Sequence, residues 1–299
     1  MKFGKFVVNF LRRRLIKGNN FRRKFYPSLT TFEGLIDVPY IDDGINNHKF
    51  DIFYAKEKNR NNICIIDIHG GAYVFGEHRD NYEFGYQFLK KGFDFIEIDY
   101  IPNNGRLDTK YSIDDCVRCI NHIFRHLDEY KLNNDKFVLM GDSAGGHFAL
   151  LIAEAINNKD VADKLGYEFN DIKIELLLVN SPVYDVWTVG DEMLNNSGKR
   201  RLFGPRFNDE NVMKLISPNT YLENFNISFF VSTCKKDFLR EQSIKLKEDA
   251  EKFNKDFTFL DINSDSRNVS HVHNVVNPKL KESITVNNAM MDFILNKIK

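Results

Sequence analysis

Apolar runs about as long as a β-strand alternate along the chain with segments of helical spacing. Most of these runs show no polar alternation, which is typical of strands that are buried on both faces of a sheet. The segments between them carry apolar residues on one side only, which predicts helices that cover the sheet. The strand-like segments are 34–41, 49–55, 61–71, 93–101, 135–141, 172–183, 227–236 and 257–263. The helical segments are 81–92, 112–131, 144–159 and about 278–298.

The order of these elements predicts an α/β fold. Strands that alternate with helices form a mostly parallel central sheet flanked by helices. The turn-rich DDGINNH between the first two strands predicts an antiparallel hairpin at one edge of that sheet. In such sheets the chemically active groups gather at the carboxyl ends of the strands. Candidate functional residues are therefore expected directly after the strands.

Two segments do not follow this alternation. Residues 184–221 come directly after a strand and are rich in Asn, Gly and Pro. We interpret about 185–218 as an insertion above the sheet and 1–33 as an N-terminal helical segment. Together they are predicted to form a small helical cap over the strand ends of the main domain, residues 34–299.

The N-terminal segment combines an apolar stripe with positive charge. Residues 1–32 contain nine Lys or Arg and no acidic residue, although the whole chain has no net charge. We expect the stripe to pack over the rest of the protein; the alternative is a helix that lies on an anionic membrane surface. The apolar run is too short for a signal peptide or a membrane span. The stripe consists of Phe3, Phe6, Val7, Phe10, Leu11 and Leu15.

Composition narrows the class of protein. Lys plus Arg and Asp plus Glu number 42 each, so net charge gives no reason to expect nucleic acid or a strongly charged partner. Apolar residues make up 42% of the chain, which is typical of a folded domain. The cysteines are too few and too scattered for a disulfide framework, so we expect buried thiols and a reducing, cytoplasmic setting. They are Cys64, Cys116, Cys119 and Cys234.

One glycine-rich motif surrounds Ser143. The sequence Gly141-Asp142-Ser143-Ala144-Gly145-Gly146 lies between a buried strand and a helix. G-x-S-x-G at such a junction is a nucleophile elbow, in which small flanking residues allow a sharp turn that exposes the serine oxygen above the sheet. The amino terminus of the following helix stabilises negative charge at the same place. Ser143 is therefore the candidate nucleophile.

A second glycine-rich motif follows an earlier buried strand. In His69-Gly70-Gly71-Ala72-Tyr73 the glycines allow backbone amides to face a common point. An oxyanion hole needs such donors where the oxygen of a tetrahedral intermediate develops. We predict that the oxyanion hole consists of Gly70, which makes the turn, and the N–H groups of Gly71, Ala72 and Ala144.

A serine nucleophile also needs a histidine base and a carboxylate that orients it. In this elbow type the chain order is serine, acid, histidine, each after a strand. Asp237 directly follows the strand-like segment 227–236, and His271 lies in the loop after 257–263. Asp185 is the alternative acid and His273 the alternative base.

These motifs resemble those of the hormone-sensitive lipase-like α/β-hydrolases, the bacterial esterase/lipase group with an HGGG signature. The segments HGGAYVFG, GDSAGG, CKKDFLREQS and SHVHNVVNP occur in the family's order, and the resemblance extends from about residue 35 to 299. It implies an α/β-hydrolase fold with a mobile cap. It favours Asp237, which opens an Asp-x-Leu-Arg-like pattern, and His271, which opens an H-x-F-like pattern.

The sequence departs from the family pattern at three places. Ala72 replaces the third glycine, which keeps the N–H but adds a methyl group near the acyl site. The D-Y-R-L-A-P-E stretch of the family is reduced to DYIPNNG at 99–105, which calls the local packing into question. His273 stands where the family has an aromatic residue, so a second titrating group is expected to influence the pH profile.

The motifs and the resemblance predict a serine carboxylesterase that hydrolyses short-chain acyl esters of small molecules through an acyl-enzyme. No metal or cofactor is expected. Two alternatives stay open: a ligand-binding relative that keeps the fold without the chemistry, and a lipase that works at a membrane surface. The residues expected to contact substrate are Tyr73, Trp187, Phe203 and Phe207.

Overall fold

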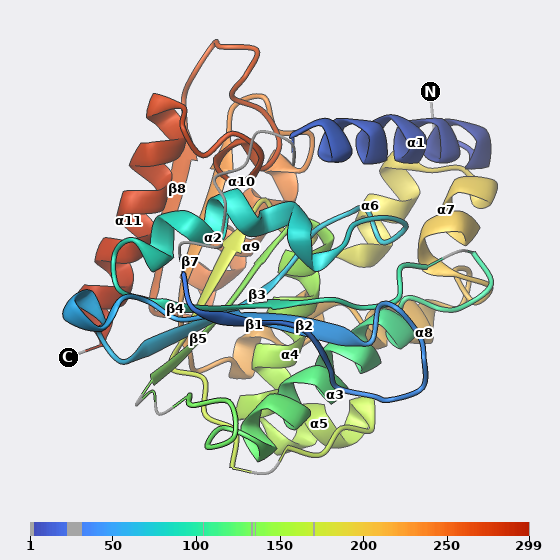
Figure 1. The fold of residues 1–299 in the computed structure, drawn as a ribbon. Helices are drawn as coiled ribbons and strands as arrows, with labels where there is room; N and C mark the ends of the chain where they lie inside the picture. The colour runs from blue at the N-terminus through green and yellow to red at the C-terminus, as the bar shows by residue number, and fades with distance from the viewer. Residues whose placement is uncertain are drawn as a thin grey trace.

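An eight-stranded sheet forms the centre of the protein (Figure 1). The computed structural model describes residues 3–22, 32–103, 105–132, 134, 136–169 and 171–298. The strands lie in the order β1-β2-β4-β3-β5-β6-β7-β8. The first two pairs in this order are antiparallel and the other five are parallel. The strands are β1 (Gly34–Pro39), β2 (Lys49–Phe53), β3 (Ile63–Ile68), β4 (Asp94–Ile98), β5 (Lys136–Asp142), β6 (Leu176–Asn180), β7 (Ser228–Cys234) and β8 (Phe257–Ile262).

Helices cover both faces of this sheet. Apolar side chains of α3, α4 and α9 pack on one face, and those of α2 and α11 pack on the other. Figure 1 shows α2 above the central strands, α11 at the left beside β8, and α3, α4 and α5 below the central strands. The α-helices are α1 (Lys5–Arg22), α2 (Tyr82–Leu89), α3 (Lys110–Arg125), α4 (Ala144–Asn157), α5 (Lys159–Leu165), α6 (Val186–Met193), α7 (Asn196–Phe203), α8 (Glu210–Leu215), α9 (Arg240–Lys252), α10 (His273–Val276) and α11 (Lys281–Lys297). Short 3₁₀ turns occupy Glu57–Asn59, His78–Asn81, Pro218–Thr220 and Leu222–Asn224.

The apolar runs predicted as buried strands are confirmed. Every residue of β3, β4 and β6 is buried, as expected for strands with helices on both faces. The four cysteines are free thiols, and all are buried. Among the described residues, no helix is both long enough and apolar enough to cross a membrane.

The sequence patterns did not identify α9. This helix is rich in Lys and Glu, and its buried side chains include only two apolar ones, Leu246 and Ala250. An apolar stripe that narrow leaves no helical periodicity to detect. The helix connects β7 to β8 and so makes their pairing parallel.

Where the structure describes them, the two segments predicted to form a cap contain helices α1, α6, α7 and α8, but α1 packs by an unexpected face. Phe3, Phe6, Val7 and Phe10 of the predicted stripe are all exposed, so the expectation that they pack over the protein is wrong. The face turned toward the body contains Val8, which is buried. The side chains of Leu11 and Leu15 lie outside the described residues.

Small and hydrogen-bonding residues make the inner face of α1. A Cβ atom on Gly4 would come within 2.9 Å of the Asn195 side chain, so this glycine lets the helix approach closely. Arg12 donates a 2.7 Å hydrogen bond from Nε to the Val74 carbonyl. These contacts decide which face of α1 packs against the body. A hydrophobicity pattern cannot reveal them, because they depend on a glycine and on a polar side chain.

Candidate active site

Ser143 stands at the sharp turn between β5 and α4. Its backbone has φ 52° and ψ −115°, a left-handed conformation that is strained for a residue with a side chain. The Ser143 N–H donates to the carbonyl of Asn180 at the end of β6, which stabilises this conformation. Close packing requires a glycine at position 145, because a Cβ atom there would lie 1.9 Å from the carbonyl oxygen of Ile68. The G-x-S-x-G motif thus has the local geometry of an elbow.

The structure brings Ser143, His271 and Asp237 together from three different loops. The Nε2 atom of His271 lies 2.9 Å from the Ser143 Oγ. Its Nδ1 atom lies 2.7 Å from Oδ1 of Asp237. The neutral imidazole can therefore accept the serine proton at Nε2 while Nδ1–H donates to the carboxylate. The hydroxyl and imidazole lie 128 positions apart in sequence. They meet because β5 and β8 belong to the same parallel part of the sheet, so the loops after both strands lie at one edge of it.

Asp237 is stabilised as a carboxylate. Burial by itself would raise its pKa, but the adjacent His271 and hydrogen bonds to the carboxylate outweigh burial and lower the pKa. These donors include the Leu239 N–H, 2.8 Å from Oδ1, and the Thr233 hydroxyl, 3.0 Å from Oδ2. The acid is thus both charged and fixed in orientation.

The alternative acid and the alternative base lie in other environments. Asp185 forms an ion pair with Lys245 and accepts hydrogen bonds from the N–H and hydroxyl of Thr188, so it caps α6. His273 is buried in the first turn of α10, and burial lowers its pKa. His273 is thus held neutral over more of the pH range than an exposed histidine.

The loop after β3 has the backbone strain expected of a donor loop. Gly71, Ala72 and Tyr73 have φ angles of 143°, 47° and 64°. Within the described part of the chain, the N–H groups of Gly71 and Ala72 donate to no protein acceptor, and nor does that of Ala144 at the start of α4. The Gly70 N–H differs, since it donates to Asp142 Oδ1 at 2.9 Å. Gly70 is therefore part of the turn and is not available as an oxyanion donor.

A buried carboxyl network supports this loop from below. The Asn81 amide donates to both Asp67 and Asp142, at 2.8 and 2.9 Å. Burial, together with the nearby Asp142 carboxyl, raises the pKa of Asp67 to about 7. Burial and the neighbouring Asp67 also raise the pKa of Glu97, which lies opposite Asp67 in the parallel β3–β4 register. Acidic residues inside apolar strands were the sequence signal for this network, and our sequence reasoning missed it.

The first two residues of the DYIPNNG segment, Asp99 and Tyr100, are buried and well packed although the segment departs from the family pattern. The Tyr100 ring stacks on His69 with centroids 4.4 Å apart, and its hydroxyl donates to the His69 carbonyl at 2.9 Å. Asp99 lies 3.0 Å from His78 Nδ1 and 3.4 Å from His69 Nε2. Burial opposes ionisation of Asp99, but the two histidines prevail and lower its pKa to about 2. The first residues of the donor loop are thus fixed from this side as well.

One cluster of metal-ligand type lies outside the site. Ligand atoms of Asp37, Asp51 and His78 come within 4.8 Å of one another. Burial would lower the pKa of His78, but Asp51 and Asp99 raise it to about 9, so this imidazole is a cation at neutral pH. Lys49 and Arg79 form ion pairs with Asp37. These cations neutralise the carboxylates, and the cluster fits an ion-pair network better than a metal centre.

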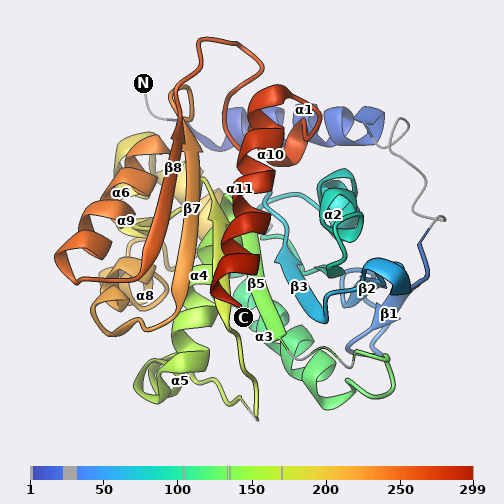
Figure 2. The same ribbon diagram turned by 90° about the vertical axis from the view of Figure 1, so that its left-hand side faces the viewer.

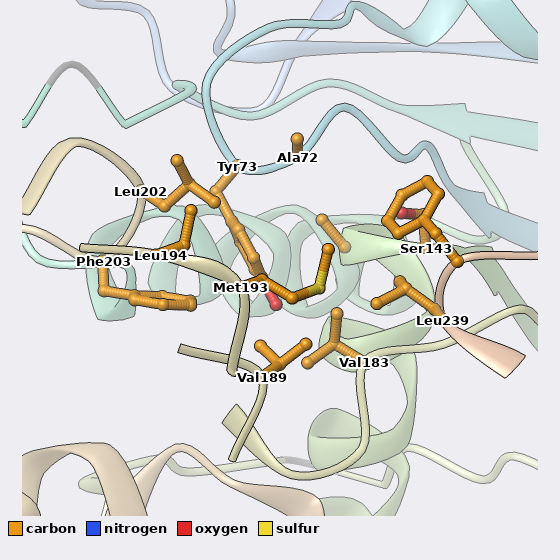
Figure 3. A pocket seen from close by; sticks show the side chains of 12 residues that line it. Ala72, Tyr73, Ser143, Val183, Val189, Met193, Leu194, Leu202, Phe203 and Leu239 are labelled. Carbon is orange, nitrogen blue, oxygen red and sulfur yellow. The ribbon is translucent and has the colours of Figure 1, made fainter. Parts of the chain in front are cut away.

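An apolar pocket of about 70 Å³ opens beside Ser143. Figure 3 shows Ser143 at one end of it and Phe203 at the other, with Met193 and Val189 between them. The residues come from the loop after β3, the turn at Ser143, the segment 183–203 and the loop after β7. They are Ala72, Tyr73, Ser143, Ala144, Val183, Val189, Met193, Leu194, Leu202, Phe203, Phe238 and Leu239.

Two of the four residues predicted to contact substrate line this pocket. Tyr73 and Phe203 do, and the Tyr73 hydroxyl lies 3.1 Å from Nδ1 of the buried His147. Trp187 and Phe207 do not belong to the lining, so their assignment is corrected. Trp187 lies in the first turn of α6 beneath the Lys199 ammonium, and Phe207 is buried in the core beyond the end of α7.

The structure adds pocket residues that sequence reasoning missed. Val189, Met193 and Leu194 come from α6 and its end, and Leu202 from α7. Inside the insertion no strand register or motif indicates which apolar residues face inward. Phe238 had a signal, because it directly follows Asp237. Its ring lies 4.2 Å from the His271 imidazole.

Comparisons with known proteins agree with this architecture. The sequence profile of the BD-FAE family matches residues 50–250. Esterase LipQ of Mycobacterium tuberculosis is 26% identical over 207 residues, 67% of this chain and 48% of the relative. An acetyl esterase of Salmonella paratyphi B is 27% identical over 137 residues, 45% of this chain and 40% of the relative. The chain thus spans less than half the length of these relatives.

Solved structures extend the similarity to nearly the whole fold. Esterase B of Lactobacillus rhamnosis superposes with a TM-score of 0.85 at 18% identity, covering 97% of this chain and 93% of that one. The same esterase inhibited by a tributyrin phosphonate superposes with a TM-score of 0.82 and 18% identity, covering 99% and 96%. The predicted α/β-hydrolase fold is confirmed. The chain belongs to the BD-FAE family, among the hormone-sensitive lipase-like α/β-hydrolases.

Proposed function

We propose that the protein is a serine carboxylesterase that hydrolyses short-chain acyl esters of small molecules. The observation that carries the proposal is the continuous hydrogen-bonded series from Asp237 through His271 to Ser143, with distances of 2.7 and 2.9 Å. The similarity of the chain to esterase LipQ, to an acetyl esterase and to a phosphonate-inhibited esterase B supports the same chemistry. In this proposal the helices α1, α6 and α7 act as the cap.

The reaction proceeds in two acyl-transfer steps. The Ser143 Oγ attacks the ester carbonyl carbon while His271 Nε2 takes its proton. The bond to the alcohol oxygen breaks, the imidazolium gives its proton to that oxygen, and the acyl group stays on Ser143. Water then attacks the acyl carbon and loses a proton to His271. The bond between the acyl carbon and Ser143 Oγ breaks, the imidazolium returns its proton to Oγ, and the carboxylic acid leaves. Asp237 stabilises the imidazolium in both steps.

The N–H groups of Gly71, Ala72 and Ala144 stabilise the oxyanion. Each well-placed donor contributes roughly 3 to 4 kcal/mol to the transition state. The left-handed φ angles of Gly71 and Ala72 orient the donor loop before substrate arrives. Because these amides donate to no acceptor of the described chain, no internal hydrogen bond has to break.

The size of the pocket favours a small acyl group. A volume of about 70 Å³ is well below the roughly 300 Å³ of the smallest common ligand sites. The lining is almost entirely apolar, so it suits an uncharged acyl chain and offers little to a charged one. Phe203 lies at the end away from Ser143, and Met193 and Val189 line the pocket between the two ends, so they limit the space for an acyl chain.

Replacement of the nucleophile tests the chemistry. Ser143→Ala should lower kcat for p-nitrophenyl acetate by at least about 10⁴-fold, because the activated hydroxyl is lost. The midpoint temperature of thermal unfolding should be unchanged or slightly higher, because the only side-chain hydrogen bond of Ser143 in the described structure that the substitution removes is the one with His271. Turnover equal to that of the unaltered protein would contradict the proposal.

A chain-length series tests the substrate class. Across p-nitrophenyl esters from acetate to palmitate, kcat/KM should be highest for the short acyl groups. Met193→Ala should shift the optimum toward longer chains by about tenfold in relative kcat/KM, since the removed methylenes leave room for acyl carbons. Trp187→Ala, on the same helix but outside the lining, is the matched control. An unchanged profile for Met193→Ala would contradict the assignment of this pocket to the acyl chain.

A further inference from the structure

The outer side of α1 carries a row of solvent-exposed aromatic residues. Phe6 is 91% exposed and Phe10 is 63% exposed. Phe3 and Val7 are exposed as well, at 41% and 40%. A contiguous exposed row of this kind usually marks an interaction surface.

Contacts on the inner side of α1 hold this row in place. The Lys5 N–H donates to the Ser197 hydroxyl at 3.0 Å, and Arg201 Nε donates to the Asn9 side chain at 2.9 Å. The backbone N–H of Phe3 donates to the Met193 carbonyl at 2.8 Å. The orientation of the helix is therefore set by α7 and by the end of α6. Its apolar row cannot fold back onto the body.

Positive charge continues the same side of the helix. Arg13 and Lys17 are exposed. Counted from Phe6, Phe10 lies at i+4, Arg13 at i+7 and Lys17 at i+11, and this spacing places all four on one helical face. The segment 1–32 contains nine basic residues and no acidic one. Its surface thus combines aromatic rings with cations and has no carboxylate of its own.

We propose that this outer face of α1 docks on an anionic lipid surface. Aromatic side chains enter the boundary between headgroups and acyl chains, while Arg and Lys attract anionic headgroups. A second copy of the chain fits less well, because a two-fold interface through this face would offer Arg13 and Lys17 no carboxylate from the same face of the other copy. The face also has no Asp or Glu that would attract a cationic partner.

The docked helix adjoins the wall of the acyl pocket. Phe3 is hydrogen-bonded to Met193 and Asn195, and Arg12 to the carbonyl of Val74 beside the donor loop. Figure 2 shows α1 across the same end of the molecule as α10 and the loop after β8, which carries His271. Docking would therefore present the pocket to esters dissolved in the lipid. This consequence rests on the proposed esterase function, whereas the docking does not.

Vesicle flotation tests the docking without relying on hydrolysis. Protein with the Ser143→Ala substitution is mixed with vesicles of phosphatidylcholine alone or with 30% phosphatidylglycerol. We expect flotation with the anionic vesicles, and a clear loss of it in 0.5 M salt. Phe6→Ser/Phe10→Ser should reduce the floated fraction at least tenfold, and Arg13→Glu/Lys17→Glu several-fold.

A matched variant separates specific docking from general stickiness. Ile284 and Leu295 on α11 are 46% and 49% exposed, and Ile284→Ser/Leu295→Ser should float like the unaltered protein. Equal flotation of the Phe6→Ser/Phe10→Ser variant would overturn the proposal, as would binding only to an acidic protein or a dimer that this variant dissociates. Hydrolysis of soluble p-nitrophenyl acetate should be the same with and without the two phenylalanines.

Discussion

The sheet with its strand-end loops and the cap helices above it obey different rules. In the sheet, burial on both faces produces unbroken apolar runs, and the turns after β3 and β5 require particular small residues. In the N-terminal helix α1, apolar side chains occur on both sides. Val8 faces the body while Phe6 faces solvent, although the two lie only two positions apart. Apolar pattern therefore predicts structure where both faces are covered and fails where one face is left open.

The largest expected effect separates the two candidate acids. Asp237→Asn should lower kcat by about 10⁴-fold, because the amide cannot stabilise the imidazolium and favours the wrong tautomer of His271. Asp185→Asn should leave kcat nearly unchanged and cost about 1 kcal/mol of stability, because it weakens the ion pair with Lys245 and the cap of α6. Steady-state kinetics and chemical unfolding of both variants measure this. A comparable fall in kcat for the two would contradict the assignment of Asp237.

A smaller effect concerns the carboxyl network under the donor loop. The folded pKa of Asp67, about 7, lies above its unfolded value, so the folded state binds an extra proton between pH 4 and pH 7. Stability from this group is present below pH 4 and is lost as pH rises through 7. Asp67→Asn cannot ionise and should match the unaltered protein at pH 4, then exceed it at pH 8 by on the order of 4 kcal/mol.

Urea unfolding at several pH values measures this difference. Asp163→Asn, an exposed position on α5, is the control and should show a flat difference from pH 4 to pH 8. A flat difference for Asp67→Asn as well would mean that Asp67 is ionised at little cost. The buried carboxyl network would then need another explanation.

The smallest effect tests which face of α1 packs. Val8→Ala should destabilise the docked helix by about 1 kcal/mol and so speed hydrogen exchange of the α1 amides about fivefold. Phe6→Ala should change exchange little, since its ring is 91% exposed. The opposite ranking would show that the phenylalanine stripe, and not Val8, holds the helix.

Much of the fold and the meeting of the site residues could be predicted from the sequence. Ser143, Asp237 and His271 each follow a strand, and parallel strands end at one edge of the sheet, so chain order indicated which side chains would meet. The alternatives were separated only by the structure. Asp185 also follows a strand, but Lys245 and Thr188 engage its carboxylate.

The pocket and the cap could not be predicted to the same depth. Trp187 is the largest side chain of the insertion, yet Met193 and Val189 line the pocket in its place. Which residues of α6 face inward depends on the ion pair of Asp185 with Lys245 and on the hydrogen bond of Met193 with Phe3, and both are long-range contacts. Gly70 shows a similar limit, since its N–H is engaged by Asp142 across 72 positions of sequence.

The account depends most on Ser143 being a nucleophile activated by His271. Treatment of the folded protein with an alkyl fluorophosphonate, followed by peptide mass mapping, tests this directly. We predict one adduct, on Ser143, that is absent from Ser143→Ala and forms far more slowly in His271→Ala. An unlabelled protein, or an adduct on another residue that persists in Ser143→Ala, would contradict it.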